Sequence, residues 1–162
     1  MLSGHQWLAV VGCVMLMSSL AHDAAVAQNE RSVLTETSKD PVVISGQLRA
    51  GLELTQLALA HFQRPDAVET FETCYQITYR AYAQIRVLVS SLSFAQRESK
   101  SPDPMLALQL KYTDQAWSLI RRVTDSHYGS TGIHVSPEQI PRDIENLSEA
   151  VKILRRVATT MP

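Results

Sequence analysis

Apolar residues recur at alternating intervals of three and four positions along much of the chain. The longest such stripe comprises Val68, Phe71, Tyr75, Thr78, Tyr82, Ile85, Val89 and Leu92. This spacing places all its members on one face of an α-helix. Asp66 and Glu69 stand at the spacing of a capping box before the stripe. We therefore predict a helix over residues 65–98.

The C-terminal stretch shows the same alternation. Its stripe comprises Ile140, Ile144, Leu147, Val151, Leu154, Ala158 and Met161. Ser136 followed by Pro137 is a favourable N-cap with a first-turn proline, although Pro141 leaves the helix start open by about one turn. Acidic residues precede Lys152 and Arg155, an order that suits the helix dipole. We predict a second helix here.

Two further helices are expected from weaker patterns. One follows Ser101 and Pro102, ends at 127–129, and buries Met105, Leu108, Tyr112, Ala116, Leu119 and Val123, with Trp117 and Ile120 widening the stripe. The other covers 43–62 and places Leu48, Leu52, Thr55, Leu59 and Phe62 on one side. Gly46 and Gly51 weaken this last prediction, because glycine costs up to about 1 kcal/mol relative to alanine in a helix interior.

Prolines separate these four stretches, and the connections between them are short. Amphipathic helices joined in this way bury their stripes most simply in an all-α, antiparallel up-down-up-down four-helix bundle. We predict this bundle for residues 41–162. In that topology residues 60–66 and 125–138 lie at the same end of the molecule.

The first 27 residues have the pattern of a cleaved signal peptide. An apolar run over 7–20 is too short to cross a hydrocarbon core of about 30 Å as a helix. It is followed by Ala25, Val26 and Ala27, a small-x-small cleavage pattern. We predict cleavage before Gln28 and export to the periplasm or the exterior.

Residues 28–40 are polar and show no sustained period, which predicts a flexible leader before the bundle domain. A lipid anchor at Cys13 is a minor alternative to signal cleavage. The apolar run continues past Cys13 instead of ending there, which argues against lipidation. After cleavage Cys74 is the single cysteine, so no intramolecular disulfide forms. We expect Cys74 to be a small buried residue, with an intermolecular disulfide as the alternative.

Composition limits the classes of function. The chain has 162 residues, of which 45% are hydrophobic, so it can bury a core. Asp23 is the only charged residue in the first 27, and the remainder carries 15 basic and 15 acidic side chains. A formally neutral domain disfavours a nucleic-acid partner. Arginine pairs at 121–122 and 155–156 lie in late helical turns, where dipole compensation explains them.

Three histidines, His61, His127 and His134, fall at the same end of the predicted bundle. Imidazole is a common metal ligand, and Asp66, Asp125 or Cys74 would complete a site. The spacing between His127 and His134 matches no ligand motif, so we predict no metal site. No Cys-x-x-Cys-His sequence for haem attachment is present, and we predict no cofactor.

Tyr75, Tyr79 and Tyr82 form a stripe on the longest predicted helix, with Tyr112 and Trp117 on the next one. Such rings either line a ligand groove or partner surface, or pack at the edge of the core with their hydroxyls in water.

The loop over 128–135 contains glycines, hydroxyls and a histidine. Ser126 or Ser130 with His127 or His134 and Asp125 would be the components of a nucleophilic site. No strand-turn-helix nucleophile elbow and no glycine-rich phosphate motif accompanies them, so we predict that the protein is not an enzyme.

Together these observations favour a non-enzymatic, exported helical bundle that binds a protein partner, in a scaffolding, masking or inhibitory role, or that forms a homo-oligomer. No integral membrane span is expected. The alternative is a bundle that binds a metal or small ligand at the end carrying His61, His127 and His134.

Overall fold

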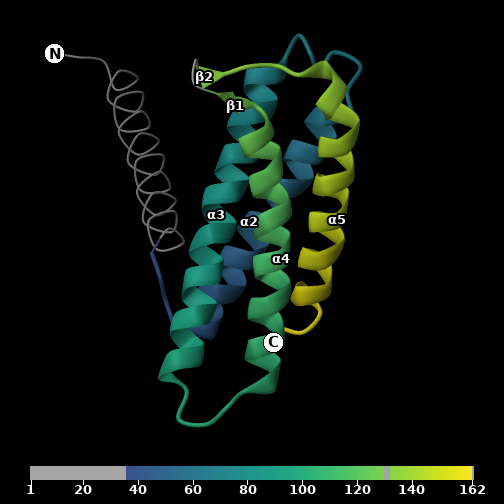
Figure 1. Cartoon of the computed structure of the whole chain (residues 1–162). Coiled ribbons are helices and arrows are strands. Elements are labelled where there is room, and N and C mark those ends of the chain that lie inside the picture. The colour runs from purple at the N-terminus through teal and green to yellow at the C-terminus, as the bar shows by residue number, and fades with distance from the viewer. Residues whose placement is uncertain (1–35, 130–131, 162) are drawn as a thin grey trace, which may run out of the picture. The chain divides into compact units, whose positions relative to one another are not determined.

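The computed structural model describes residues 36–129 and 132–161 and is mostly helical (Figure 1). Its elements in chain order are α2 (Pro41–Phe62), α3 (Phe71–Glu98), α4 (Pro104–Ser126), β1 (Tyr128–Gly129), β2 (Gly132–Ile133), the short 3-10 helix η1 (Pro137–Gln139) and α5 (Ile140–Ala158). The predicted all-α class is confirmed. The predicted signal peptide, its cleavage site, Cys13 and residues 28–35 of the predicted leader lie outside the described residues.

The four helices pack against one another, as predicted. α3 contacts α2 and α4, and α5 likewise contacts α2 and α4, so every helix has two neighbours (Figure 1). The largest fully buried side chains include Phe62, Ile85, Leu88, Ile120, Leu147 and Leu154, with at least one from each helix. The core therefore lies along the common axis of all four helices.

Contacts near the helix ends show which ends meet. The ring of Phe62, at the end of α2, packs against Phe71 at the start of α3 and against His127 just after α4. Far from these residues, Nε2 of Gln109 in the second turn of α4 donates to the backbone oxygen of Thr160, beyond the end of α5, at 3.0 Å. The ends of α2 and α4 thus lie near the start of α3, and the start of α4 lies near the end of α5.

Gly51 lies where α2 approaches α3 closely. A Cβ at this position would overlap Cδ1 of Ile85, which is fully buried. The glycine that weakens the helix by propensity is therefore the residue that permits the two helices to pack closely.

The predicted start of α3 is wrong, because the helix begins at Phe71 and residues 65–70 form turns. The Asp66 carboxylate does not cap the helix. It accepts hydrogen bonds from Nε and Nη2 of Arg64 at 2.9 and 2.7 Å, and this guanidinium lowers the pKa of Asp66. Val68, predicted on the buried stripe, is exposed.

The predicted buried stripe of α4 is confirmed at Ala116, Ile120 and Val123 and is wrong in the first turns of the helix. Met105 and Leu108 are exposed, and the buried residues are Gln109, Thr113, Ala116, Ile120, Val123 and Thr124. Polar side chains occupy the buried face because they have partners: Oγ1 of Thr113 donates to the backbone oxygen of Gln109 at 2.8 Å. The N-cap of α4 is Asp103, since its Oδ1 accepts hydrogen bonds from two backbone amides of the first turn.

The predicted stripe of α5 assumed a strict heptad spacing. The buried residues instead follow the ordinary helical period, so the prediction is wrong at both ends of the helix. Asp143 is buried while Ile140 and Ile144 are half-buried, and Val157 is buried where Ala158 was predicted. Ser136 forms no side-chain capping bond to η1.

Residues 36–40, the end of the predicted leader, contact the helices. The backbone amide of Ser38 donates to Oγ of Ser91 at 3.0 Å, and Nε2 of Gln47 donates to the backbone oxygen of Glu36 at 2.7 Å. Within residues 36–129 and 132–161, no helix combines the length and apolarity needed to cross a membrane.

Candidate functional site: an aromatic groove between α3 and α4

The candidate site is a surface groove of about 480 Å³, here called the aromatic groove. It is lined by Tyr75, Gln76, Tyr79, Tyr82 and Arg86 of α3, Thr124 and Asp125 of α4, Tyr128 of β1 and Ile133 of β2. Four of these nine residues are tyrosines. Rings with an apolar body and a polar tip suit a surface that alternates between water and a bound partner.

The tyrosines of α3 form a continuous ladder of rings. Tyr75 stacks on Tyr79 with 6.4 Å between ring centroids, and Tyr79 lies 6.0 Å from Tyr82. Tyr82 then stacks on Trp117 of α4 at 5.6 Å, and the Arg121 guanidinium lies 5.8 Å from the Trp117 ring. The spacing of three and four residues on one helix face produces this ladder.

The groove combines two exposed tyrosine rings with one buried tyrosine ring. Tyr79 is 51% exposed and Tyr128 is 65% exposed, whereas Tyr75 is 7% exposed. Burial raises the pKa of the Tyr75 phenol, and the nearby Tyr128, Tyr79 and Asp125 groups raise it further. Tyr75 is therefore a buried, uncharged member of the groove lining at neutral pH.

A short hairpin forms the outer wall of the groove. Tyr128 pairs with Ile133, and Gly129 pairs with Gly132. Gly132 has φ of 102°, a conformation that residues with a side chain rarely adopt. The backbone amide of His134 donates to the oxygen of His127 at 3.0 Å, which closes the hairpin against the end of α4.

His127 anchors this hairpin to the core. Its ring is fully buried, packs 4.5 Å from the Phe71 ring, and has hydrogen-bond partners at both nitrogens. Nε2 lies 2.6 Å from Oδ2 of Asp143, and Nδ1 lies 3.2 Å from the backbone oxygen of His134. Since a carbonyl only accepts, Nδ1 is the donor in the contact with His134.

These polar groups do not form a nucleophilic triad. Oγ of Ser126 donates to the backbone oxygen of Val123 at 3.0 Å and lies 3.4 Å from Oδ1 of Asp143. The carboxylate thus stands between the serine and the histidine, whereas a triad places the histidine between the other two. The buried pair positions the hairpin.

The three histidines form no metal cluster. Both nitrogens of His127 are occupied, and its ring centroid lies 6.4 Å from that of His134. The buried Nδ1 of His61 has no hydrogen-bond partner in the described part of the chain. Across residues 36–129 and 132–161, no group of three or more His, Cys, Asp or Glu side chains is arranged to hold a metal ion.

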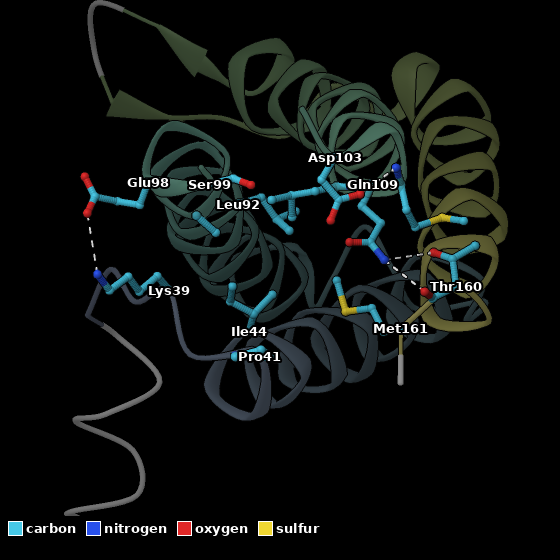
Figure 2. Close-up of a pocket in the computed structure, with 13 residues that line it drawn as sticks. Lys39, Pro41, Ile44, Leu92, Glu98, Ser99, Asp103, Gln109, Thr160 and Met161 are labelled. Carbon is cyan, nitrogen blue, oxygen red and sulfur yellow. Dashed lines mark hydrogen bonds and ion pairs between the residues drawn. The ribbon is translucent and has the colours of Figure 1, made fainter. Parts of the chain in front are cut away.

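A second pocket, of about 460 Å³, lies where the starts of α2 and α4 meet the ends of α3 and α5 (Figure 2). Figure 2 shows the Lys39–Glu98 ion pair, 3.5 Å long, at one edge, and the Gln109 amide nitrogen directed at Thr160 at the other. Ile44, Leu92 and Met161 lie between them. Its polar groups are occupied by these local bonds, so we regard the aromatic groove as the stronger candidate.

The sequence pattern identified part of the aromatic groove. The pattern named Tyr75, Tyr79 and Tyr82 as one stripe, with Trp117 on the next helix. These four residues form the ladder in the structure. Tyr112 does not belong to it, because its ring instead lies 5.6 Å from the guanidinium of Arg156.

Some of the remaining groove residues come from distant parts of the chain. Tyr128 and Ile133 were predicted only as loop residues, and Arg86 was not predicted. Arg86 does stand one helical turn after Tyr82, so extending the tyrosine stripe would have found it. Cys74 is buried, as predicted.

The chain was also compared with known proteins. No model of a protein family, no curated protein and no solved structure gives a match.

Proposed function

We propose that this chain is an exported, non-enzymatic helical bundle that binds a protein partner through the aromatic groove. The observation that carries this proposal is the set of outward-facing rings at one site: Tyr79 and Tyr128 are more than half exposed, beside Ile133, which is 41% exposed. Tyrosine is enriched at the centres of protein interfaces, because it supplies a large contact area with little loss of side-chain freedom.

The proposed scaffold is an antiparallel up-down-up-down bundle. Phe62, Phe71 and His127 support it at one end, and the Gln109–Thr160 hydrogen bond supports it at the other. In this arrangement α3 and α4 are rigid walls, and the His127–Asp143 pair holds the hairpin beside them. A rigid groove loses little conformational entropy when a partner binds.

The open shape of the groove favours a protein over an enclosed small molecule. Its rim carries one basic and one acidic side chain, Arg86 and Asp125, around the tyrosine rings. An aromatic centre with a charged rim is the usual organisation of a protein interface.

The test places a photo-crosslinking amino acid at Gln76, on the exposed edge of the groove, in the exported protein. We expect a crosslinked protein that is lost in Tyr79→Asp and Tyr128→Asp variants, because a buried carboxylate opposes association. Leu57→Asp is the matched control, since Leu57 is 47% exposed on α2, outside the groove. Capture that survives both tyrosine changes, or that fails equally in the control, overturns the proposal.

The groove could instead bind a second copy of this chain, and a further measurement distinguishes that case from binding of a different protein. Light scattering after size-exclusion chromatography separates it from a different protein. A mass near that of one mature chain, together with a crosslink that depends on Tyr79, identifies a heterologous partner. A dimer abolished by Tyr79→Asp identifies self-association instead.

A further inference from the structure

The two charged residues of the aromatic groove lie near its opposite ends. Asp125 lies in the last turn of α4, three residues before Tyr128, and both residues line the groove with Tyr75. Arg86 lies eleven positions after Tyr75 on α3, which corresponds to about 16 Å along the helix axis. The groove therefore has an acidic end and a basic end.

The acidic end has the composition of a cation-binding site. Tyr75, Tyr79 and Tyr128 line the groove together with Asp125, and Tyr79 and Tyr128 are the exposed rings of the three. The π face of an aromatic ring is electrostatically negative. Aromatic faces attract ammonium and guanidinium groups within about 6 Å, and a neighbouring carboxylate adds to that attraction.

Cation–aromatic pairing already recurs on the surface of this protein. The guanidinium of Arg121 lies 5.8 Å from the Trp117 ring, and that of Arg156 lies 5.6 Å from Tyr112. Nζ of Lys39 lies 5.9 Å from the Phe94 ring. Tyr79 and Tyr128 offer exposed rings of the same kind beside an acidic group.

Asp125 is available to an incoming cation. Its ion pair with Arg121, from Oδ2 to Nε at 3.2 Å, is exposed on both sides, with side-chain exposures of 64% and 55%. Exposed pairs of this kind contribute little to stability. Arg121 has a second contact besides Asp125, because its guanidinium lies 5.8 Å from the Trp117 ring.

We infer that the acidic end of the groove binds a lysine or arginine side chain of the partner protein, held between Tyr79, Tyr128 and Asp125. This inference rests on the proposed function and gives the chemistry of the same site. Arg86 repels a second cation from the far end. The partner segment therefore enters with its basic residue toward the hairpin.

The test titrates the full exported protein with small probes of defined charge, followed by NMR of labelled tyrosine rings. N-acetyl-arginine methylamide and N-acetyl-lysine methylamide are the cationic probes. Their neutral counterparts are N-acetyl-citrulline methylamide and N-acetyl-norleucine methylamide. We expect saturable shifts of Tyr79 and Tyr128 with the cations, and binding at least about threefold weaker with the neutral probes.

Variants locate the binding site. Asp125→Asn and Tyr128→Leu are expected to weaken the binding of the cationic probes by about threefold to fivefold. Asp114→Asn is the matched acidic control, because Asp114 is exposed on α4 but lies outside the groove. Arg121→Gln breaks the same ion pair as Asp125→Asn while keeping the carboxylate, so binding should be retained. Equal binding of arginine and citrulline, or equal losses in Asp125→Asn and Asp114→Asn, overturns the inference.

These outcomes are separable from failure of the proposed function. Cation binding at Tyr128 without any crosslink that depends on Tyr79 supports the cation site and rejects the protein-binding role. A partner that requires Tyr79 but binds Asp125→Asn as strongly as the unaltered protein rejects the cation site alone.

Discussion

Nε2 of His127 lies 2.6 Å from Oδ2 of Asp143, and the two side chains are 0% and 2% exposed. This bond joins the residue after α4 to the first turn of α5. Through Nδ1 the same ring also holds the backbone oxygen of His134. One buried imidazole thus connects two helices and the hairpin that forms a wall of the aromatic groove.

Removing either member of this pair should strongly destabilise the fold. In His127→Leu the Asp143 carboxylate stays buried without its partner, and we expect a loss of about 3–5 kcal/mol in the free energy of unfolding. Asp143→Asn keeps a polar partner and should cost less. Urea denaturation followed by circular dichroism measures both.

The double variant His127→Leu with Asp143→Leu provides the control for that prediction. Because no buried charge remains, it should recover much of the stability lost in the single variant. Single variants within about 1 kcal/mol of the unaltered protein would show that the pair is dispensable for folding.

The helices were predictable from the sequence, whereas the exact face that each one buries was less so. Periodic apolar residues predicted all four helices, yet the buried faces of α4 and α5 include Gln109, Thr113 and Asp143. Their burial depends on partners such as Thr160 and His127, which no local pattern identifies. The apolar pattern therefore identified the centre of each buried face, such as Ile120 and Leu147, and missed the polar residues that extend it.

Only the part of the aromatic groove that lies on one helix was predictable from the sequence. Tyr75, Tyr79 and Tyr82 share one helix face, so their spacing alone indicates the ladder. Tyr128 and Asp125 join them only through the packing of α3 on α4 and the anchoring of the hairpin. Tertiary contacts, not sequence spacing, determine that second half of the site.

Export gives a prediction about the mature N-terminus. The small-x-small pattern at residues 25–27 predicts cleavage by signal peptidase before Gln28. Sequencing of the protein recovered from the periplasm or culture medium should begin at Gln28. An N-terminus at a lipid-modified Cys13 would replace this prediction with membrane anchoring.

Cys74 should react slowly in the folded protein. Burial raises the pKa of its thiol, so less of the reactive thiolate is present at a given pH. Labelling with a disulfide reagent at pH 8 should require unfolding, and its rate should rise to that of a free thiol in urea. Rapid labelling without denaturant would contradict the burial of Cys74.

The raised pKa of Cys74 also has a consequence for stability. Its thiol ionises more readily in the unfolded chain than in the folded one, so stability should fall as pH rises past the ordinary cysteine pKa of about 8.5. Unfolding in urea between pH 7 and pH 10 measures the trend. A Cys74→Ala variant, compared with itself across that range, should lose less stability. An identical slope in the two proteins would assign the alkaline loss to other groups.

Gly51 supplies the most specific test of the helix packing. Gly51→Ala adds a Cβ that overlaps Cδ1 of Ile85, which must move within a fully buried site. Overpacking of this kind costs about 1–3 kcal/mol, which exceeds the gain of up to about 1 kcal/mol from replacing glycine in a helix. We therefore expect a net loss of stability in urea denaturation.

The double variant provides the control. Ile85→Val removes the colliding Cδ1, so Gly51→Ala should be less harmful when it is combined with Ile85→Val. This non-additivity identifies the contact. A Gly51→Ala protein more stable than the parent would show that α2 and α3 are not held at this close approach.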